Sequence, residues 1–385
     1  MDVFVDTFRA MGTDVEITVV DADPTLLSVA RRRIADLEQR WSRFIDSSEV
    51  SRLNRAGGVP TRVSAETLAL VMRAQEGFDL TGGRFDALQL RALERLGYIE
   101  SFERLTNVSD PEVMRPVPVL TRSEPPARIE IDANASTVRI PPGCGFDPGG
   151  IGKGFAADLV VEEMRALGAA GVCVNVGGDV RVAGTAPQGD TWIIAVRDRA
   201  EDQPVAHLAV ADGAVATTSR SRRRWRGPDG QVHHHIIEPA TGSSAVTPVV
   251  HATAVASEGW RAEILAKVAF LDRAEGIALA ERMGATAMVA TENGIVTGPG
   301  WAKFERTLSR AKSGEQEATP MGNDSAPADP TPVHRRGPNG PARRANSGEQ
   351  EATPMGNDSA PADPTSVHRR GPNGPARRAK SGELV

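Results

Sequence analysis

A near-perfect internal repeat limits how much of this chain can fold. Residues 313–346 recur at 347–380, and a third copy begins at Ser381. A period of this length is typical of helical solenoids, but each copy is rich in Pro, Gly, Ala, Ser and charge. Such a segment has no apolar face to stack and cannot offset its ordering entropy by burial. We therefore expect 311–385 to be a disordered tail and 1–306 to be the folded domain.

The composition of the whole chain excludes several classes of protein. Hydrophobic residues make up 40%, enough for a sizeable core, while two cysteines are too few for a disulfide scaffold. The net charge of −5 and the 4% of aromatic residues argue against a nucleic-acid partner. No apolar run approaches the roughly 18 residues that span a bilayer. Asp2, Asp6 and Arg9 stand where a signal peptide would be apolar, so we expect a cytoplasmic protein.

Hydrophobic periodicity divides the folded part into strands and long helices. The stretch 14–20 alternates like a half-buried strand, and 24–41 repeats apolar residues at helical spacing. The expected strands are 3–8, 14–20, 172–176, 180–183, 192–196, 206–210 and 214–217, with hairpins within 129–140 and 285–297. The expected helices are 24–41, 64–81, 155–167, 259–271 and 274–283. Long helices between antiparallel-looking strand sets favour an α+β fold over a doubly wound parallel sheet.

A glycine-rich segment is the strongest local signal of chemistry. Asp147 is followed by Pro-Gly-Gly-Ile-Gly-Lys-Gly, directly before an expected helix. Glycines let backbone N–H groups approach a phosphate, and a helix N-terminus adds positive potential. Lys153 can reach a phosphoryl oxygen as a point charge, although the segment does not match GxxxxGK[ST]. A tight turn before a helix explains the glycines equally well, so both interpretations stay open.

Other segments carry polar side chains, each with a structural alternative. The NVGGD segment at 175–179 suits a hairpin turn as well as a ligand contact. The run 217–225 combines hydroxyl and guanidinium groups that suit a phosphate, a solvated basic loop or an RNA contact. Three adjacent histidines end at His235. Because neighbouring side chains in a strand point to opposite faces, the three cannot converge on one metal ion, and a single histidine that acts as an acid or base is favoured. Glu263 and Lys267 share one helix face, where a surface ion pair is the alternative.

Taken together and in order, these segments resemble the FAD:protein FMN transferase family, the ApbE-like flavin transferases. The similarity runs from Phe8 to Phe304, most of the folded part. Each motif is modest, but seven in the right order are specific. The matching segments are RAMGT at 9–13, WSRF at 41–44 with SEVSRLN at 48–54, TGGRFD at 81–86, DPGGIGKG at 147–154, NVGGD at 175–179, TS at 218–219 and HIIEPATG at 235–242.

The resemblance implies a fold, an activity and a set of site residues. The implied fold is α+β, two-lobed and T-fold-like, with FAD in a cleft between the lobes. The implied activity is transfer of FMN from FAD to a Thr or Ser hydroxyl of an acceptor flavoprotein, with release of AMP. By motif position the candidate catalytic residues are His235 and Lys153. The expected role of His235 is to assist deprotonation of the acceptor hydroxyl or to orient the phosphate, and Lys153 is expected beside the cofactor phosphates. The candidate cofactor-binding residues are Met11, Phe44, Asn54, Arg84, Phe85, Asp86, Lys153, Ser219 and Ile236.

The resemblance also implies magnesium at the diphosphate, but the sequence departs from the family's metal motif. The family has Asp and, four residues on, Thr as ligands beside a backbone carbonyl; here these positions are Glu263 and Lys267, with Gly150 as the carbonyl donor. A Glu carboxylate can coordinate a hard cation, whereas an ammonium has no lone pair. Three outcomes are open: water replaces the Thr ligand, the Lys267 ammonium replaces part of the metal's charge, or FAD binds without being turned over. We expect weaker metal dependence or low activity.

Three alternatives to a transferase stay open at this stage. The same site suits an FAD pyrophosphatase that yields FMN and AMP. Lys267 in place of a metal ligand supports a non-catalytic flavin-binding module. RNA binding through 220–226 would show a steep dependence on salt, and the acidic net charge argues against it.

Overall fold

The structure is a computed structural model that describes residues 1–105, 127–197, 204–221, 223–306 and 321–322. Within these residues the largest element is an eight-stranded antiparallel sheet in the order β1-β2-β6-β7-β10-β15-β16-β17. Its strands are β1 (Val3–Ala10), β2 (Thr13–Val20), β6 (Gly171–Val176), β7 (Asp179–Gly184), β10 (Gly213–Ser219), β15 (Val249–Ala256), β16 (Thr286–Thr291) and β17 (Gly294–Thr297). The edge strand β1 exposes alternate residues, whereas β6 is buried throughout because both of its faces are covered.

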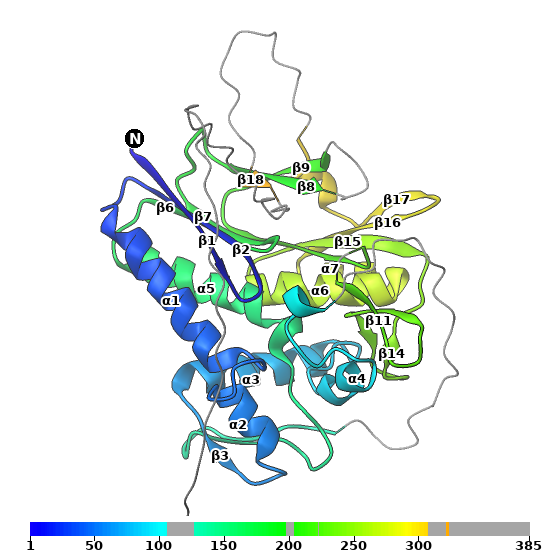
Figure 1. Cartoon of the computed structure of the whole chain (residues 1–385). Helices are drawn as coiled ribbons and strands as arrows, with labels where there is room; N and C mark the ends of the chain where they lie inside the picture. The colour runs from blue at the N-terminus through cyan, green and yellow to red at the C-terminus, as the bar shows by residue number, and fades with distance from the viewer. Residues whose placement is uncertain (106–126, 198–203, 222, 307–320, 323–385) are drawn as a thin grey trace, which may run out of the picture. The chain divides into compact units, whose positions relative to one another are not determined.

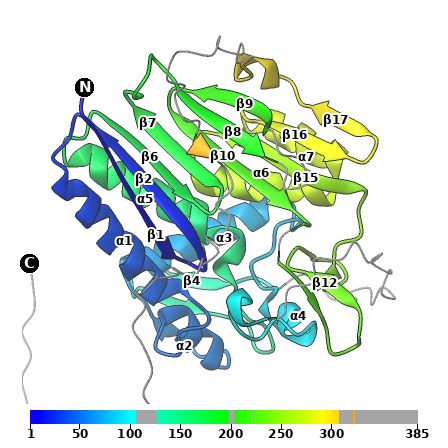
Figure 2. The ribbon, with the colours of Figure 1, turned by 45° about the horizontal axis from the view of Figure 1, so that its top comes forward.

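Four helices cover one face of this sheet (Figures 1 and 2). They are α1 (Thr25–Trp41), α5 (Gly152–Ala166), α6 (Gly259–Leu271) and α7 (Arg273–Arg282). The helix α1 buries a single stripe that runs from Leu26 to Trp41, as its spacing predicts. The helix α6 is buried nearly all round, because it packs on β10 and β15 and also contacts α3, α5 and α7. Polar residues on α6 are therefore placed in the interior.

A second apolar layer covers the opposite face of the sheet. It is a small sheet of β8 (Trp192–Arg197) and β9 (Pro204–Val210), with the two-residue strand β18 (Met321–Gly322) paired parallel to β8. Trp192, Ile194 and Leu208 pack there against side chains of β6, β7 and β10, and Trp301 joins them from the turn η3 (Trp301–Lys303). The central strands of the large sheet are thus enclosed between helices and a second sheet.

The remaining elements form a smaller part beyond the helices (Figure 1). Its helices are α2 (Glu49–Arg55), α3 (Ala65–Leu80) and α4 (Leu90–Arg95), and its short turns are η1 (Phe102–Arg104) and η2 (Pro148–Gly150). Its strands are β3 (Thr61–Arg62), β4 (Glu130–Asp132), β5 (Thr137–Arg139), β11 (Arg224–Arg226), β12 (Val232–His234), β13 (Ile237–Glu238) and β14 (Ser243–Ser244). The expected α+β class is confirmed.

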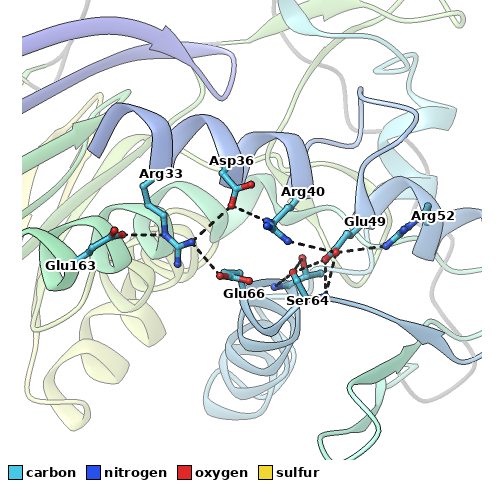
Figure 3. A network of polar contacts seen from close by, with 9 residues as sticks. Arg33, Asp36, Arg40, Glu49, Arg52, Ser64, Glu66 and Glu163 are labelled. Atoms are coloured by element: carbon cyan, nitrogen blue, oxygen red, sulfur yellow. Dashed lines mark hydrogen bonds and ion pairs between the residues drawn. The ribbon is translucent and has the colours of Figure 1, made fainter. Parts of the chain in front are cut away.

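A network of ion pairs joins α1 to this smaller part (Figure 3). Arg33 of α1 reaches Glu66 of α3 at 3.2 Å and Glu163 of α5 at 3.4 Å. Further along α1, Arg40 lies 3.9 Å from Glu49 of α2. These side chains are partly exposed, so each pair contributes only about 0–1 kcal/mol. The network orients the helices, while apolar packing supplies most of the stability.

The predicted tail lies almost entirely outside the described residues. Of 311–385, Met321 and Gly322 alone are described, as β18. The domain boundary at 306 stays a prediction. Among the described residues, no helix combines the length and the apolar character that crossing a membrane requires.

Candidate active site

A cavity of about 360 Å³ gathers most of the predicted site residues. Its wall is formed by the β1–β2 turn, the segments 84–89 and 235–239, the glycine-rich turn and one side of α6. The predicted residues that line it are Met11, Phe44, Arg84, Phe85, Asp86, Gly150, Lys153, His235, Ile236 and Lys267. The fold therefore brings together residues that are widely separated in the sequence.

The glycine-rich turn is held in place by a buried ion pair. Asp147 accepts a hydrogen bond from Gly149 N at 2.8 Å and so caps the short turn η2 that leads into α5. Its other carboxylate oxygen lies 3.2 Å from Arg43 Nε, whose guanidinium covers the rings of Phe44 and Tyr98. The N-terminus of the 15-residue α5 thus faces the cavity, an arrangement that attracts an anion.

Two lysines and two carboxylates form a buried cluster beside this turn. Lys153 contacts Asp179 and donates to Glu263 Oε1 at 3.0 Å. Lys267 donates to the same Oε1 at 3.3 Å, while Gly154 N donates to Oε2 at 2.9 Å. The Glu263 side chain is 2% exposed, so both of its oxygens depend on protein donors. The predicted i, i+4 pair of α6 is confirmed, but it is buried rather than a surface pair.

The charges in this cluster shift one another's pKa. Burial would raise the pKa of Glu263, but the ammonium groups of Lys153 and Lys267 lower it below its ordinary value. Burial would lower the pKa of Lys153, yet the carboxylates of Asp179 and Glu263 more than offset this and raise it. Burial dominates for the other two members, raising the pKa of Asp179 and lowering that of Lys267. The pKa of each member therefore depends on the charges of its neighbours in the cluster as well as on burial.

A close crossing of α5 and α6 creates the cluster. A Cβ on Gly154 would overlap the carbonyl of Gly259, so the two backbones touch at this point. Asp158 of α5 then caps α6 by accepting from Gly259 N at 2.6 Å and Trp260 N at 3.0 Å. Burial raises the pKa of Asp158 to about 7, although both caps and Arg181 oppose the rise. The cap fixes the start of α6, the helix that carries Glu263.

The three adjacent histidines point in different directions, as the strand argument predicts. His233 lies 2.9 Å from Asp229, and His234 is buried with Nε2 donating to Ala245 O at 3.0 Å. Burial lowers the pKa of His234 to about 4. His235 lines the cavity, and among the described residues its Nδ1 has no hydrogen-bond partner. Burial and then the positive charge of Arg223 hold the pKa of His235 well below its ordinary range, so its imidazole is neutral at pH 7.

The other end of the cavity is aromatic and apolar. Met11 occupies the two-residue β1–β2 turn with Gly12, both at positive φ (53° and 65°), a conformation typical of tight hairpins. Met11 N donates to Glu38 at 2.7 Å, which fixes the turn at the mouth of the cavity. Arg84 pairs with Glu238 at 3.0 Å, which ties an arginine of the wall to the segment that follows His235.

Two predicted cofactor residues do not line the cavity. Asn54 instead accepts from Phe146 N at 2.7 Å and donates to Phe146 O at 2.9 Å, and so anchors the chain just before the glycine-rich turn. The Ser219 hydroxyl lies 2.7 Å from that of Ser221 at the end of β10. For these two residues a direct contact with the ligand is not supported, although Asn54 shapes the site from behind, as expected.

The basic run after β10 contributes one residue to the cavity wall among those described. Arg223 lines the cavity, whereas Arg220 donates to Thr247 O at 2.9 Å and pairs with Glu292 at 2.9 Å. Arg222 lies outside the described residues. The sequence analysis also did not single out Arg43 and Tyr98 as site residues, although both line the aromatic end of the cavity. The pairing of Arg43 with Asp147 could not be foreseen, because more than a hundred residues separate the two.

The donors present do not fit the magnesium ion that the resemblance implies. Both oxygens of Glu263 already accept N–H donors, and Lys267 can offer a metal no lone pair. A Cβ on Gly150 would lie 2.9 Å from Lys267 Cε, so the lysine chain packs against this residue of the turn. In the part of the chain that the structure describes, no three His, Cys, Asp or Glu side chains gather as a metal site.

The fold and cavity define an α+β protein whose pocket joins a glycine-rich turn at a helix N-terminus to an aromatic wall. The chain belongs to the ApbE family, whose family model matches residues 11–289. The FAD:protein FMN transferase of Vibrio cholerae is 28% identical over 303 residues, covering 74% of this chain and 87% of that relative. The protein of the same name from Treponema pallidum is 30% identical over 242 residues, 59% of this chain and 65% of the relative.

Solved structures show the same architecture. The ApbE protein of Thermotoga maritima matches with a TM-score of 0.68 at 25% identity, covering 80% of this chain and all of that one. The flavin transferase ApbE from Vibrio cholerae matches with a TM-score of 0.63 at 22% identity, over 79% of this chain and 99% of that one. Membership of the family and the fold expected from the sequence are both confirmed.

Proposed function

We propose that this enzyme transfers FMN from FAD to a Thr or Ser hydroxyl of an acceptor flavoprotein and releases AMP. The names of the curated relatives support the general activity, and the cavity supports its application to this chain. The observation that carries the proposal is that His235, Lys153 and the glycine-rich turn line one cavity. A base, a cation and an anion-binding turn in one space are what phosphoryl transfer requires.

Each part of the cavity has a role in this reaction. The FAD diphosphate would lie against the N-terminus of α5 and Lys153, which stabilise its negative charge. The ring systems of FAD would pack on the wall that includes Met11, Phe44 and Phe85. Arg84, Asp86 and Ile236 would complete that wall. Asn54 acts indirectly, since its two hydrogen bonds hold Phe146 at the start of the turn.

His235 would act on the attacking hydroxyl. In the proposed step, the acceptor oxygen forms a bond to the phosphorus of the FMN half, and the bond from that phosphorus to the AMP oxygen breaks. The hydroxyl proton passes to the imidazole of His235, and AMP leaves with the bridging oxygen. The imidazole of His235 is neutral at pH 7 and so has an unprotonated nitrogen to accept that proton, although its low pKa makes it a weaker base than an exposed histidine. General-base assistance of this kind typically contributes about 10²–10⁴-fold in rate.

The test combines mass spectrometry with nucleotide analysis. The protein is incubated with FAD and an acceptor that carries an Asp-Gly-x-Ser/Thr-Gly-Ala-Thr target, and AMP is measured by chromatography. We expect the acceptor to gain the mass of FMN less water, with one AMP released for each FMN transferred. His235→Asn should reduce the rate by about 10²-fold or more while FAD still binds. His207→Asn is the matched control, because His207 lies on β9 and does not line the cavity.

Three other outcomes would contradict the proposal. Release of FMN and AMP without a change in the acceptor would indicate a pyrophosphatase. Bound FAD without AMP release would indicate a non-catalytic flavin-binding module. Failure of FAD to bind under any condition would refute the assignment of the cavity itself.

A further inference from the structure

The buried cluster places an ammonium group where the family motif has a metal ligand. Lys267 lines the cavity, its chain packs on Gly150, and its ammonium lies 3.3 Å from Glu263 Oε1. It therefore lies beside both Gly150 and Glu263, the two residues whose oxygens the resemblance assigned to magnesium. A cation bound to Glu263 would compete with the N–H donors that its carboxylate already accepts.

The charges of the cluster balance without a metal. The two carboxylates of Asp179 and Glu263 face the two ammonium groups of Lys153 and Lys267, each pair connected through contacts within the cluster. Buried charges are stable only when they are paired. With no ligand bound, a divalent cation in this enclosed space would leave the cluster with two uncompensated positive charges. The two negative charges of a bound diphosphate diester would instead face Arg223 and the N-terminus of α5. The sequence change from Thr to Lys supplies one of the charges that a cation would bring.

The ammonium groups also retain donors for an anion. Each ammonium has three N–H donors; in the described part of the chain, Lys267 is seen to use one of them, on Glu263. Both lysines line the cavity beside the N-terminus of α5, and Arg223 adds a further positive charge to the same wall. An anion seated there would meet cationic donors from three elements of the fold.

We propose that this chain binds the diphosphate of its nucleotide directly through the ammonium groups of Lys153 and Lys267, without a divalent cation. The proposal rests on the proposed function in taking FAD as the nucleotide. The ligand class is a diphosphate diester. Lys267 is a specificity-determining residue, since it replaces a metal requirement by a fixed charge. The chain should therefore keep its nucleotide affinity when divalent cations are removed.

The first test needs no variant. FAD affinity is measured by quenching of flavin fluorescence in excess EDTA and in excess MgCl₂. We expect the two dissociation constants to agree within about threefold, a difference of less than about 0.7 kcal/mol. An affinity that is at least about tenfold higher with MgCl₂ and is lost in EDTA would overturn the proposal.

Variants at position 267 test the assigned residue. Lys267→Ala should weaken FAD binding by about 10- to 100-fold with or without MgCl₂, because a charged hydrogen bond is lost. Lys267→Arg keeps the charge and should keep the indifference to metal. The double variant Glu263→Asp with Lys267→Thr restores the family's ligands and should gain about tenfold in affinity from MgCl₂. Lys303→Ala, at an exposed lysine of η3 outside the cavity wall, is the matched control.

The results separate this proposal from the proposed function. If FAD binds only with MgCl₂, the metal-free diphosphate site is wrong while the FAD assignment survives. If FAD binds under neither condition, the proposed function fails, and inorganic pyrophosphate then tests the anion site alone by thermal shift. An equal rise in the protein's melting temperature with pyrophosphate in EDTA and in MgCl₂ would support the metal-free anion site. A rise that requires MgCl₂, or no rise under either condition, would refute it. Circular dichroism of each variant shows whether lost binding reflects lost folding.

Discussion

Replacement of Glu263 by alanine should destabilise the whole domain, because this buried residue holds the two lysines that line the cavity. Glu263 is 2% exposed and accepts from Lys153 Nζ, Lys267 Nζ and Gly154 N. Its removal leaves two buried ammonium groups with Asp179 as their nearest counter-charge. Breaking a buried ion pair on one side costs about 3–5 kcal/mol. That is a large share of the roughly 5–15 kcal/mol by which a domain is stable.

Urea unfolding followed by tryptophan fluorescence measures this loss. All five tryptophans are buried, including Trp260 three residues before Glu263 on the same helix, so their combined emission reports on unfolding of the whole domain. We expect Glu263→Ala to lose about 3–5 kcal/mol with an unchanged m-value. Glu292→Ala is the control, because Glu292 pairs with Arg220 at a side-chain exposure of 76% and should lose less than about 1 kcal/mol. A loss below about 1 kcal/mol for Glu263→Ala would refute the view that this carboxylate organises the cluster.

The same comparison has a defined dependence on pH. The folded-state pKa of Glu263 is lowered below the ordinary value of 4.5, so the folded state binds fewer protons at this group than the unfolded state does. Its stabilising contribution is therefore present above pH 4.5 and is lost as pH falls through the folded-state pKa. The difference in stability between the wild type and Glu263→Ala should be constant near neutral pH and should shrink in acid. A difference that grows in acid would contradict this assignment.

Three further substitutions test the supports of the site. Asn54→Ala should cost about 2 kcal/mol by urea unfolding and weaken FAD binding, since two hydrogen bonds to Phe146 are lost. Folding lowers the pKa of His234 from 6.5 to about 4, so between pH 6.5 and pH 4 the unfolded state binds more protons than the folded state. The free energy of unfolding should therefore drop by roughly 3 kcal/mol on acidification from pH 6.5 to pH 4. His234→Gln should reduce this dependence of stability on pH. Arg43→Lys should cost about 1–2 kcal/mol and weaken FAD binding in fluorescence titrations, because an ammonium cannot both pair with Asp147 and cover the two rings.

The sequence predicted the elements whose periodicity is clear and missed several whose pattern is not, among them α2, α4 and β15. The expected helices and most strands are present, including α1 with its single buried stripe. The strand β15 was not expected, although it lies inside the sheet between β10 and β16. Its residues, VVHATAVA, are mostly small and almost all buried, so they show no alternation between a polar and an apolar face. Periodicity cannot identify such a strand, because both of its faces are covered.

The motifs predicted well which residues lie together in the site, but they predicted less well the role of each residue. Lys153, His235 and Arg84 were placed in the site by motif order, and they line the cavity. Asn54 belongs to an equally good motif but bonds to the backbone behind the turn. The order of the motifs indicates that a residue belongs to the site, but it does not indicate whether the side chain lines the cavity or supports the wall from behind. The burial of Glu263 also lay beyond the sequence, since it depends on how closely two helices approach.

That approach depends on two glycines, which gives a direct test of how packing controls the cavity. Gly154 and Gly259 touch where α5 crosses α6, and a Cβ on either would overlap the backbone of the other. Gly154→Ala should therefore force the helices apart and move Gly154 N from Glu263 Oε2, now 2.9 Å away. We expect a loss of about 1–3 kcal/mol or more from overpacking, together with weaker FAD binding. Gly152→Ala is the matched control for stability alone, since Gly152 itself lines the cavity. It makes the same change two residues earlier in α5, where a Cβ would meet only Pro148 at 3.4 Å, and the higher helix propensity of alanine should leave stability equal or higher. Equal effects of the two substitutions on the midpoint of urea unfolding would mean that the contact between the helices does not position Glu263.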